Sequence, residues 1–178
     1  MDAPSVRVMP LREEDIPDLV QLAHEVWYRH YPSIITVEQI EYMLAQRYSA
    51  EVIRAQLASG NAWWDKLLLD GRMIAFCACE RGKTPSELKI DKLYVHNDLQ
   101  GRGYGSLLIE HAERRARSLG CKRLTLQVNK NNRGAIETYR RNGFAVVESG
   151  VFDIGGGFAM DDYVMAKELG AQGPDDRR

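Results

Sequence analysis

Three glycines fall within five residues, at Gly101, Gly103 and Gly105, in the stretch QGRGYGS. The strand-like run LKIDKLYV precedes them, and a run with helical apolar spacing follows at once. The first amides of such a helix have no partners within the helix, and they form its positive end. Glycines there remove the Cβ atoms that would hold an anion away from these amides. The stretch therefore predicts a strand, a phosphate-binding loop and a helix in succession.

Two well-known phosphate-binding motifs do not match this loop. A P-loop requires Gly-Lys-Ser or Gly-Lys-Thr, a tripeptide that the loop lacks. A dinucleotide-binding fingerprint requires a glycine where Ser106 stands and an acidic residue about 20 positions on, where Cys121 and Lys122 stand. Taken alone, the glycines also fit a helix entry that needs unusual backbone angles and binds no ligand.

The rest of the chain alternates between helical and strand-like apolar spacing. Asp70 and Gly71 between two apolar runs predict a β-hairpin, and Gly60, Gly120 and Gly143 predict helix ends. The expected elements are strands at 5–10, 62–70, 72–80, 88–95, 122–128, 144–149 and 158–169, and helices at 16–27, 36–44, 50–57, 104–119 and 131–143. This order predicts an α+β fold in a single domain, residues 1–169, followed by a polar, disordered tail at 170–178.

Composition and charge exclude several classes of partner. A net charge of −1 gives no long-range attraction to nucleic acid or to an anionic membrane. No window approaches the ~20 apolar residues of a membrane span, and the N-terminus does not resemble a signal peptide. The three cysteines form no disulfide framework, and packing is favoured over metal ligation for Cys77 and Cys79. We expect a soluble, cytoplasmic protein with no nucleic-acid, membrane or metal partner; a homodimer stays open.

Two segments together resemble the GNAT N-acetyltransferase superfamily. QGRGYG matches the Q/R-x-x-G-x-G/A signature of that superfamily, and NKNNRGAIETYRRNGF is similar to its second acetyl-CoA segment, N-x-x-A-x-x-x-Y-x-x-x-G-F. The resemblance implies a GNAT-like fold, with a mixed, mostly antiparallel central sheet of about six or seven strands flanked by about four helices. It also implies acetyl-CoA as the acetyl-donating cosubstrate, with no metal.

The resemblance assigns roles to residues of this chain. The strand before the loop would lend backbone groups to the pantetheine arm and to the acetyl carbonyl, where an amide stabilises the tetrahedral intermediate as an oxyanion hole does. The loop would hold the pyrophosphate, and the later helix would line the coenzyme. The implied cosubstrate-binding residues are Leu93, Tyr94, Val95, Gln100, Gly101, Arg102, Gly103, Tyr104, Gly105, Ser106, Asn132, Ala135, Tyr139 and Arg141.

Tyr139 matches the family tyrosine that acts near the thioester sulfur as a general acid. A thiol has a pKa of about 8.5 and tyrosine one of about 10, so complete proton transfer to the thiolate is uphill by ~1.5 units, or ~2 kcal/mol. Transfer that is concerted with bond breaking offsets that cost. From its spacing alone, Tyr139 also fits an aromatic side chain packed with Ala135 and Ile136 on a short helix.

The acceptor amine must lose a proton before it attacks, because an alkyl ammonium with a pKa near ~10.4 is mostly charged at neutral pH. The resemblance places Asp91 where polyamine acetyltransferases often carry an amine-binding acid. The alternative is a solvated carboxylate flanked by Lys89 and Lys92. His24 and His30 lie near the expected acceptor end, but surface positions are favoured for both.

The expected acceptor-binding segments, VWYRHYPSIITVEQIEYML and VFDIGGGFAMDDYVMAKEL, resemble the bacterial diamine and polyamine branch of the superfamily, the spermidine/spermine type. An acidic lining with tyrosine hydroxyls or ring faces suits a polycation. The candidates are Tyr28, Tyr31, Tyr42, Glu38, Glu41, Asp153, Asp161 and Asp162, although these acids also fit ordinary surface carboxylates. Gly155, Gly156 and Gly157 predict a flexible hairpin tip.

Three functions stay open at this point. The leading hypothesis is acetyl transfer from acetyl-CoA to a primary amine of a small-molecule polyamine, by direct attack through a tetrahedral intermediate. The second keeps the reaction and changes the acceptor to a protein N-terminus, an amino acid or an antibiotic amine. The third is a domain that holds acyl-CoA without turnover, and the presence of Tyr139 argues against it.

Overall fold

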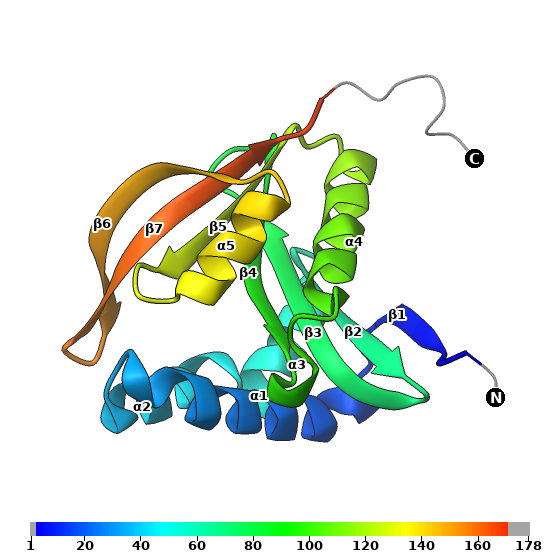
Figure 1. Ribbon diagram of the computed structural model, residues 1–178, viewed down its shortest axis with the longest axis horizontal. Coiled ribbons are helices and arrows are strands. Elements are labelled where there is room, and N and C mark those ends of the chain that lie inside the picture. Colours follow the sequence, from blue (N-terminus) through cyan, green and yellow to red (C-terminus); the bar gives the residue numbers. More distant parts are fainter. Residues whose placement is uncertain (1–2, 171–178) are drawn as a thin grey trace.

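The computed structural model describes residues 3–170, which form one seven-stranded sheet with helices on both faces (Figure 1). The strands are β1 (Val6–Pro10), β2 (Ala62–Leu69), β3 (Arg72–Arg81), β4 (Glu87–Val95), β5 (Arg123–Asn129), β6 (Ala145–Gly155) and β7 (Phe158–Glu168). The α-helices are α1 (Ile16–His30), α2 (Val37–Arg47), α3 (Ala50–Ser59), α4 (Tyr104–Ser118) and α5 (Arg133–Arg141). Three short 3-10 helices, η1 (Glu13–Asp15), η2 (Tyr31–Ser33) and η3 (Asn97–Leu99), lie between them.

The sheet has the order β1-β2-β3-β4-β5-β7-β6, and only the β4–β5 pair is parallel. The expected α+β fold with a mixed, mostly antiparallel sheet is therefore confirmed, with seven strands. The described residues contain five α-helices rather than about four. The domain boundary at 169 stays a prediction, and residues 171–178 of the predicted tail lie outside the described residues.

Two apolar clusters lie on opposite faces of the sheet. The first packs α4 and α5 against the strands, through residues such as Leu108, Ala112 and Ile136. The second packs α1, α2 and α3 against the other face, with Trp27 and Ile40 among its buried members. Each helix follows from its apolar spacing, because one stripe of side chains is removed from water while the rest stays solvated. The helices thus pack on both faces of the sheet and hold the ends of its central strands in place.

A β-bulge in β4 changes which face its side chains point to. Ile90 pairs with Cys79 and Lys92 pairs with Ala78, so Asp91 is an extra residue on β4. Before the bulge, Ile90 belongs to the cluster under α4; after it, Tyr94 packs against the cluster under α1. Simple alternation from Ile90 would send Lys92 to the α4 face, whereas the bulge turns it to the α1 face.

The predicted turns are observed, and none of the described helices could cross a membrane. Asp70 and Gly71 both have positive φ angles, +50° and +84°, as a two-residue hairpin turn requires. Gly155 to Gly157 connect β6 and β7, and Tyr42 Oη donates a hydrogen bond to the Ile154 carbonyl at 3.0 Å beside this tip. Among residues 3–170, no helix combines the length and the apolar character that a bilayer crossing needs.

Candidate active site

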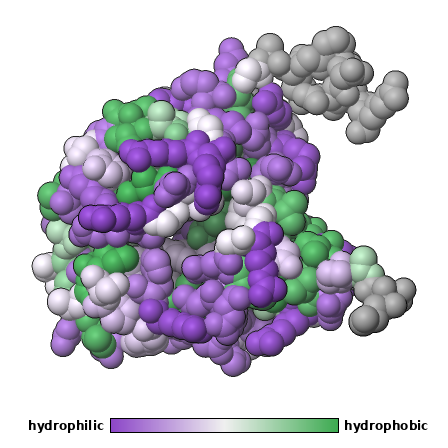
Figure 2. Space-filling view, in the orientation of Figure 1, coloured by the Kyte–Doolittle hydropathy of each residue, from purple (hydrophilic) through white to green (hydrophobic). Residues whose placement is uncertain are grey.

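The central feature of the molecule is a cleft where β4 and β5 separate. These two strands pair only over residues 87–90 and 123–126. Beyond that point both strands line a cavity of about 890 Å³, a size that suits a small-molecule ligand. Because β5 no longer pairs with residues 91–95, backbone groups on that edge of β4 point into the cleft. The space-filling view shows hydrophilic side chains over much of the face seen in Figure 1, broken by apolar patches (Figure 2).

The glycine loop and the start of α4 form one end of the cavity. Gly101 and Gly103 have φ angles of +75° and +88°, and Gly103 is the N-cap of α4. No side chain caps this helix end, so its first amides stay available to an anion. A Cβ at either glycine would meet no other protein atom within 4 Å. Glycine is therefore needed here for its positive φ angle, and not for space within the protein.

Helix α5 brings Tyr139 into the same cavity. The Tyr139 side chain is buried, and its ring lies 5.8 Å from that of Phe144. Burial raises the pKa of Tyr139 above its usual value, so the hydroxyl holds its proton. At the N-terminus of α5, Asn132 Oδ1 lies 3.1 Å from His30 Nε2. Asn142 Nδ2 donates to Ser106 Oγ at 3.1 Å, which links the ends of α5 and α4.

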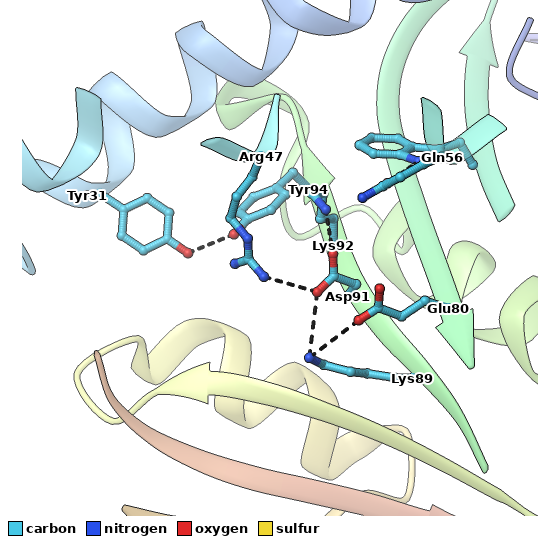
Figure 3. Close-up of polar contacts among 9 residues, drawn as sticks. Tyr31, Arg47, Gln56, Glu80, Lys89, Asp91, Lys92 and Tyr94 are labelled. Carbon is cyan, nitrogen blue, oxygen red and sulfur yellow. Dashed lines mark hydrogen bonds and ion pairs between the residues drawn. The ribbon is translucent and has the colours of Figure 1, made fainter. Parts of the chain in front are cut away.

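Aromatic side chains from three elements meet at the other end of the cavity. The hydroxyls of Tyr31 and Tyr94 lie 2.9 Å apart, and Figure 3 shows the two side chains pointing toward each other. The ring of Trp27 lies 4.2 Å from that of Tyr31 and 5.8 Å from those of Tyr48 and Tyr94. Burial raises the pKa values of Tyr31 and Tyr94, so both are neutral hydrogen-bonding groups at neutral pH.

Asp91, the extra residue of the β4 bulge, lies in a cluster of cations (Figure 3). Its Oδ1 lies 3.1 Å from Arg47 Nη2 and 3.7 Å from Lys89 Nζ, while Oδ2 accepts a hydrogen bond from Lys92. Burial by itself would raise the pKa of Asp91, but Lys92, Arg47 and Lys89 outweigh it and leave the pKa below its usual value. The solvated alternative for Asp91 is wrong, because only 8% of its side chain is exposed.

Lys92 is the most deeply buried member of this cluster, with 3% of its side chain exposed. Its Nζ lies 4.9 Å from the centre of the Trp64 ring and 5.6 Å from that of Tyr48. The charge is therefore held by one carboxylate and two ring faces. Burial lowers the pKa of Lys92, and the adjacent Asp91 carboxylate partly offsets that effect.

Two carboxylates of β6 and β7 also line the cavity, Asp153 and Asp162. Only 7% of Asp162 is exposed, and burial raises its pKa to about 6. Its neighbour Asp161 points the other way, is exposed, and pairs with Lys130. The two adjacent aspartates therefore have different surroundings, because successive side chains of a strand point to opposite faces.

The cavity brings together nearly all the residues that the sequence singles out. Of the predicted cosubstrate-binding residues only Arg102, which is exposed, does not line the cavity. The residues that line the cavity are Leu93, Tyr94, Val95, Gln100, Gly101, Gly103, Tyr104, Gly105, Ser106, Asn132, Ala135, Tyr139 and Arg141, together with Asp91 and Tyr31. The candidates that do not line it are Tyr28, Tyr42, Glu38, Glu41 and Asp161.

Two residues that line the cavity, His30 and Arg47, were not predicted from the sequence as site residues. His30 is half-buried, lines the cavity and contacts Asn132, so it lies in the cleft and not on the open surface. Arg47 also lines the cavity at the end of α2. Ile40, Met43 and Arg47 follow one another at spacings of three and four residues, so Arg47 lies on the buried face of its helix. Arg47 could have been predicted from the sequence, because it is a charged residue at the spacing of the apolar stripe of its helix.

Metal-ligating residues do not cluster in the described part of the chain. Within residues 3–170, no group of three or more His, Cys, Asp or Glu side chains is arranged to hold a metal ion. The Cys77 and Cys79 sulfur atoms are buried 4.0 Å apart. These two cysteines belong to the apolar cluster under α4.

The fold, a mostly antiparallel sheet whose parallel strands β4 and β5 separate over a cleft, is the fold of solved N-acetyltransferases. The particular family is shown by a match to the acetyltransferase (GNAT) family over residues 18–144. The chain belongs to this family, and the resemblance carried by the two acetyl-CoA segments is confirmed. It is an enzyme, an acetyl-CoA-dependent N-acetyltransferase.

Known proteins resemble the chain over most of its length or over part of it. Spermidine N(1)-acetyltransferase of Thermoplasma acidophilum is 26% identical over 149 residues, 82% of this chain and 91% of that protein. PaiA N-acetyltransferase of the same organism, solved in complex with coenzyme A, has a TM-score of 0.80 and 23% identity, covering 93% of this chain and 99% of that chain. Streptothricin acetyltransferase of Streptomyces lavendulae is 37% identical over 76 residues, 43% of this chain and 40% of that protein.

Proposed function

We propose that this enzyme transfers the acetyl group of acetyl-CoA to a primary amine of a polyamine such as spermidine or spermine. One observation carries the proposal: a single cavity joins the uncapped start of α4, the free edge of β4, Tyr139, and the carboxylates Asp153 and Asp162. An anion-binding end and an acidic end thus lie on either side of a strand edge that suits a thioester.

The cosubstrate half of the cavity suits coenzyme A. The pyrophosphate would bind the first amides of α4 between Gly101 and Ser106, where no side-chain cap competes for them. The pantetheine arm would lie along residues 93–95 of β4. The backbone groups on this edge do not pair with β5, so they could hydrogen-bond to the amides of the arm as a neighbouring strand would. Asn132, Ala135 and Arg141 would contact the coenzyme from the side of α5.

The reaction begins with attack of the neutral amine on the acetyl carbonyl carbon, which forms the C–N bond and an oxyanion. A β4 amide stabilises that oxyanion, and collapse of the intermediate breaks the C–S bond. As that bond breaks, Tyr139 donates a proton to the leaving sulfur, and the surplus proton on the nitrogen restores the phenol. Because burial raises the pKa of Tyr139, complete transfer is more uphill than reference values imply, so the proton must move as the C–S bond breaks.

The acceptor half has acidic and aromatic groups that suit a polycation. Asp153, Asp162 and Tyr31 line it, and the Tyr31 hydroxyl is paired with that of Tyr94. The similarity to the spermidine N(1)-acetyltransferase of Thermoplasma acidophilum adds support. Asp91, in contrast, already pairs with Arg47, Lys89 and Lys92, so Asp153 and Asp162 are better candidates for the amine.

A second candidate acceptor follows from the cations in the same lining. Arg47 and Lys89 both line the cavity, and either could bind a carboxylate. An amino acid or peptide would present both an amine and a carboxylate, which makes it the strongest alternative to a polyamine. An antibiotic amine is a further alternative acceptor, because part of the chain is similar to streptothricin acetyltransferase.

An amine panel tests the proposal. Release of the CoA thiol is measured at fixed acetyl-CoA with spermidine, spermine, amino acids, an N-terminal peptide and streptothricin. Saturable thiol release, highest for spermidine or spermine, is expected. Higher kcat/KM for a carboxylate-bearing amine would overturn the polyamine assignment, and acetyl-CoA binding without thiol release for any amine would leave only a coenzyme-binding domain. The cytoplasmic location and a homodimer stay predictions, the second of which light scattering would test.

A further inference from the structure

Asp162 is a buried carboxylate with an unused oxygen. It lines the cavity, 7% of it is exposed, and its Oδ1 has no hydrogen-bond partner within residues 3–170. An unpaired buried carboxylate oxygen costs free energy, of order 1–3 kcal/mol or more. Such a group persists in a folded protein where a ligand satisfies it.

Asp91 is the natural comparison, because it is equally buried and lines the same cavity. Both of its oxygens have cationic partners, Arg47 and Lys89 on one and Lys92 on the other. A substrate ammonium would have to displace one of these cations to reach Asp91. It would reach Asp162 without displacing any protein partner from Oδ1. Of these two buried carboxylates in the lining, Asp91 is neutralised by protein cations and Asp162 is available.

We propose that Asp162 binds the acceptor ammonium and is the base that takes its proton. The inference rests on the proposed function only in requiring an amine acceptor, and it specifies which side chain prepares that amine for attack. Strand β7 positions the group: Asp162 pairs with Asn129 of β5, so it lies where β5 has already separated from β4. Its side chain shares a face with Met160, which packs under α2, and therefore points to the acceptor side.

The charge environment suits this role. Burial raises the pKa of Asp162 to about 6, while nearby cations oppose the shift. At pH 7 the group is mostly ionised and can pair with an ammonium. A pKa below neutral also lets it pass the proton on to water after each turnover. The charges of Arg47 from α2, Lys89 from β4, Lys130 after β5 and Asp161 of its own strand act on Asp162, and Asp153 from β6 and Tyr31 from η2 share its cavity.

The protons balance over the whole reaction. The substrate ammonium carries two protons more than the amide nitrogen needs. One leaves through Asp162 to water before attack, and the other replaces the proton that Tyr139 gives to the CoA sulfur. The C–N bond forms and the C–S bond breaks, and no oxidant or metal takes part. The net products are the acetylated amine, CoA thiol and one released proton.

Asp162→Asn with Asp161→Asn as its matched control tests the proposal. The control removes the adjacent carboxylate of the same strand, which is exposed and paired with Lys130. With spermidine as acceptor, Asp162→Asn should lower kcat/KM by about 100-fold or more, which is the usual contribution of a general base to the rate. It should leave the KM for acetyl-CoA unchanged and abolish the rise of kcat/KM near pH 6 that the wild type should show. Asp161→Asn should match the wild type in kcat/KM and in the KM for acetyl-CoA, and it should keep the rise of kcat/KM, moved to a somewhat lower pH because the Asp161 charge helps raise the pKa of Asp162.

The other outcomes are equally decisive. Wild-type kcat/KM in Asp162→Asn would overturn the proposal, and a raised amine KM with an unchanged kcat and pH profile would overturn the role of base. If another amine replaces spermidine as the accepted substrate, the polyamine function fails, while the same variants measured with that amine still test Asp162. If no amine is acetylated, ¹³C NMR of the CoA-bound wild type decides: a carboxyl resonance of Asp162 that spermidine does not shift would overturn the inference.

Discussion

The two halves of the cleft are built in different ways. The proposed cosubstrate half, unlike the proposed acceptor half, comes from one nearly continuous stretch, from β4 through the glycine loop and α4 to α5. The acceptor half comes from segments far apart in the chain: Tyr31 and Arg47 near the beginning, Asp91 in the middle, Asp153 and Asp162 near the end. Local motifs can describe the first half, whereas only the folded chain assembles the second.

The halves also differ in how their polar groups are satisfied. The cosubstrate half presents uncapped amides of α4 and a free strand edge. The acceptor half has a neutralised cluster around Asp91 beside the available carboxylate of Asp162. We therefore expect two kinds of polar group in one cavity, those that stabilise the fold and those that bind a ligand. Substitutions of the first kind should lower stability, and substitutions of the second kind should lower binding or activity.

The largest effect should come from the two buried aspartates, with opposite signs. Asp91→Asn leaves Lys92 without its carboxylate and should destabilise the fold by about 3–5 kcal/mol at pH 7. Asp162→Asn removes a carboxyl whose pKa is raised from 3.8 to about 6, and it should stabilise the fold by about 2–3 kcal/mol at pH 7. Denaturant unfolding at pH 7 measures both.

The pH dependence follows from the same shifts. Asp91 has a lowered pKa, so its contribution to stability is present above its unfolded value and is lost as the pH falls through its folded value. Asp162 has a raised pKa, so the folded state binds more protons between about pH 4 and 6 and becomes more stable as the pH falls through that window. The gain from Asp162→Asn should therefore vanish at pH 4. Equal effects of the two variants at every pH would contradict this comparison.

Tyr139→Phe should show that this side chain serves chemistry rather than binding. Loss of the hydroxyl should lower kcat by about 100-fold while the Kd for acetyl-CoA changes little, because the ring keeps its place against Phe144. Steady-state kinetics and calorimetric titration with acetyl-CoA measure the two quantities. An unchanged kcat would remove Tyr139 from the mechanism.

Gly103→Ala should damage the cosubstrate half through the backbone. An alanine at a φ angle of +88° is strained by about 1–2 kcal/mol, so both stability and affinity for acetyl-CoA should fall. Gly105→Ala is the matched control for stability, since that position has no positive φ angle and a Cβ there would lie 3.8 Å from Leu93, an ordinary contact. Thermal unfolding compares the two. Equal losses would mean that space, and not backbone conformation, requires the glycines.

Arg47→Met should have the smallest effect and should concern the acceptor alone. Removing this half-exposed cation leaves Asp91 with Lys92 and Lys89, so the free energy of unfolding should change by less than about 1 kcal/mol. The kcat/KM for spermidine should rise a fewfold as repulsion falls, and the KM for acetyl-CoA should stay the same. A fall with spermidine, or a change in acetyl-CoA binding, would show that the halves are not independent.

Most of the fold was readable from sequence because its signals are local. Helical stripes, the Asp70-Gly71 turn and the glycine loop each depend on a few neighbouring residues, and all three were found where expected. The bulge at Asp91 was not readable, because an extra residue in a strand shows only against its partner strand. It decides that Lys92 points to the α1 face, where Trp64 and Tyr48 hold its charge.

The family and the cosubstrate could be predicted from QGRGYG, Asn132, Ala135 and Tyr139, because these residues stand at spacings that a strand, a loop and two helices impose. Which carboxylates are paired with protein cations could be learned only from the folded chain. Burial and charge pairing depend on side chains that come together only on folding, and these set Asp91 and Asp162 apart although both are aspartates in strands. Under the proposed function, the choice of acceptor would depend on this second kind of information, through the balance of Asp153 and Asp162 against Arg47 and Lys89 across the cleft.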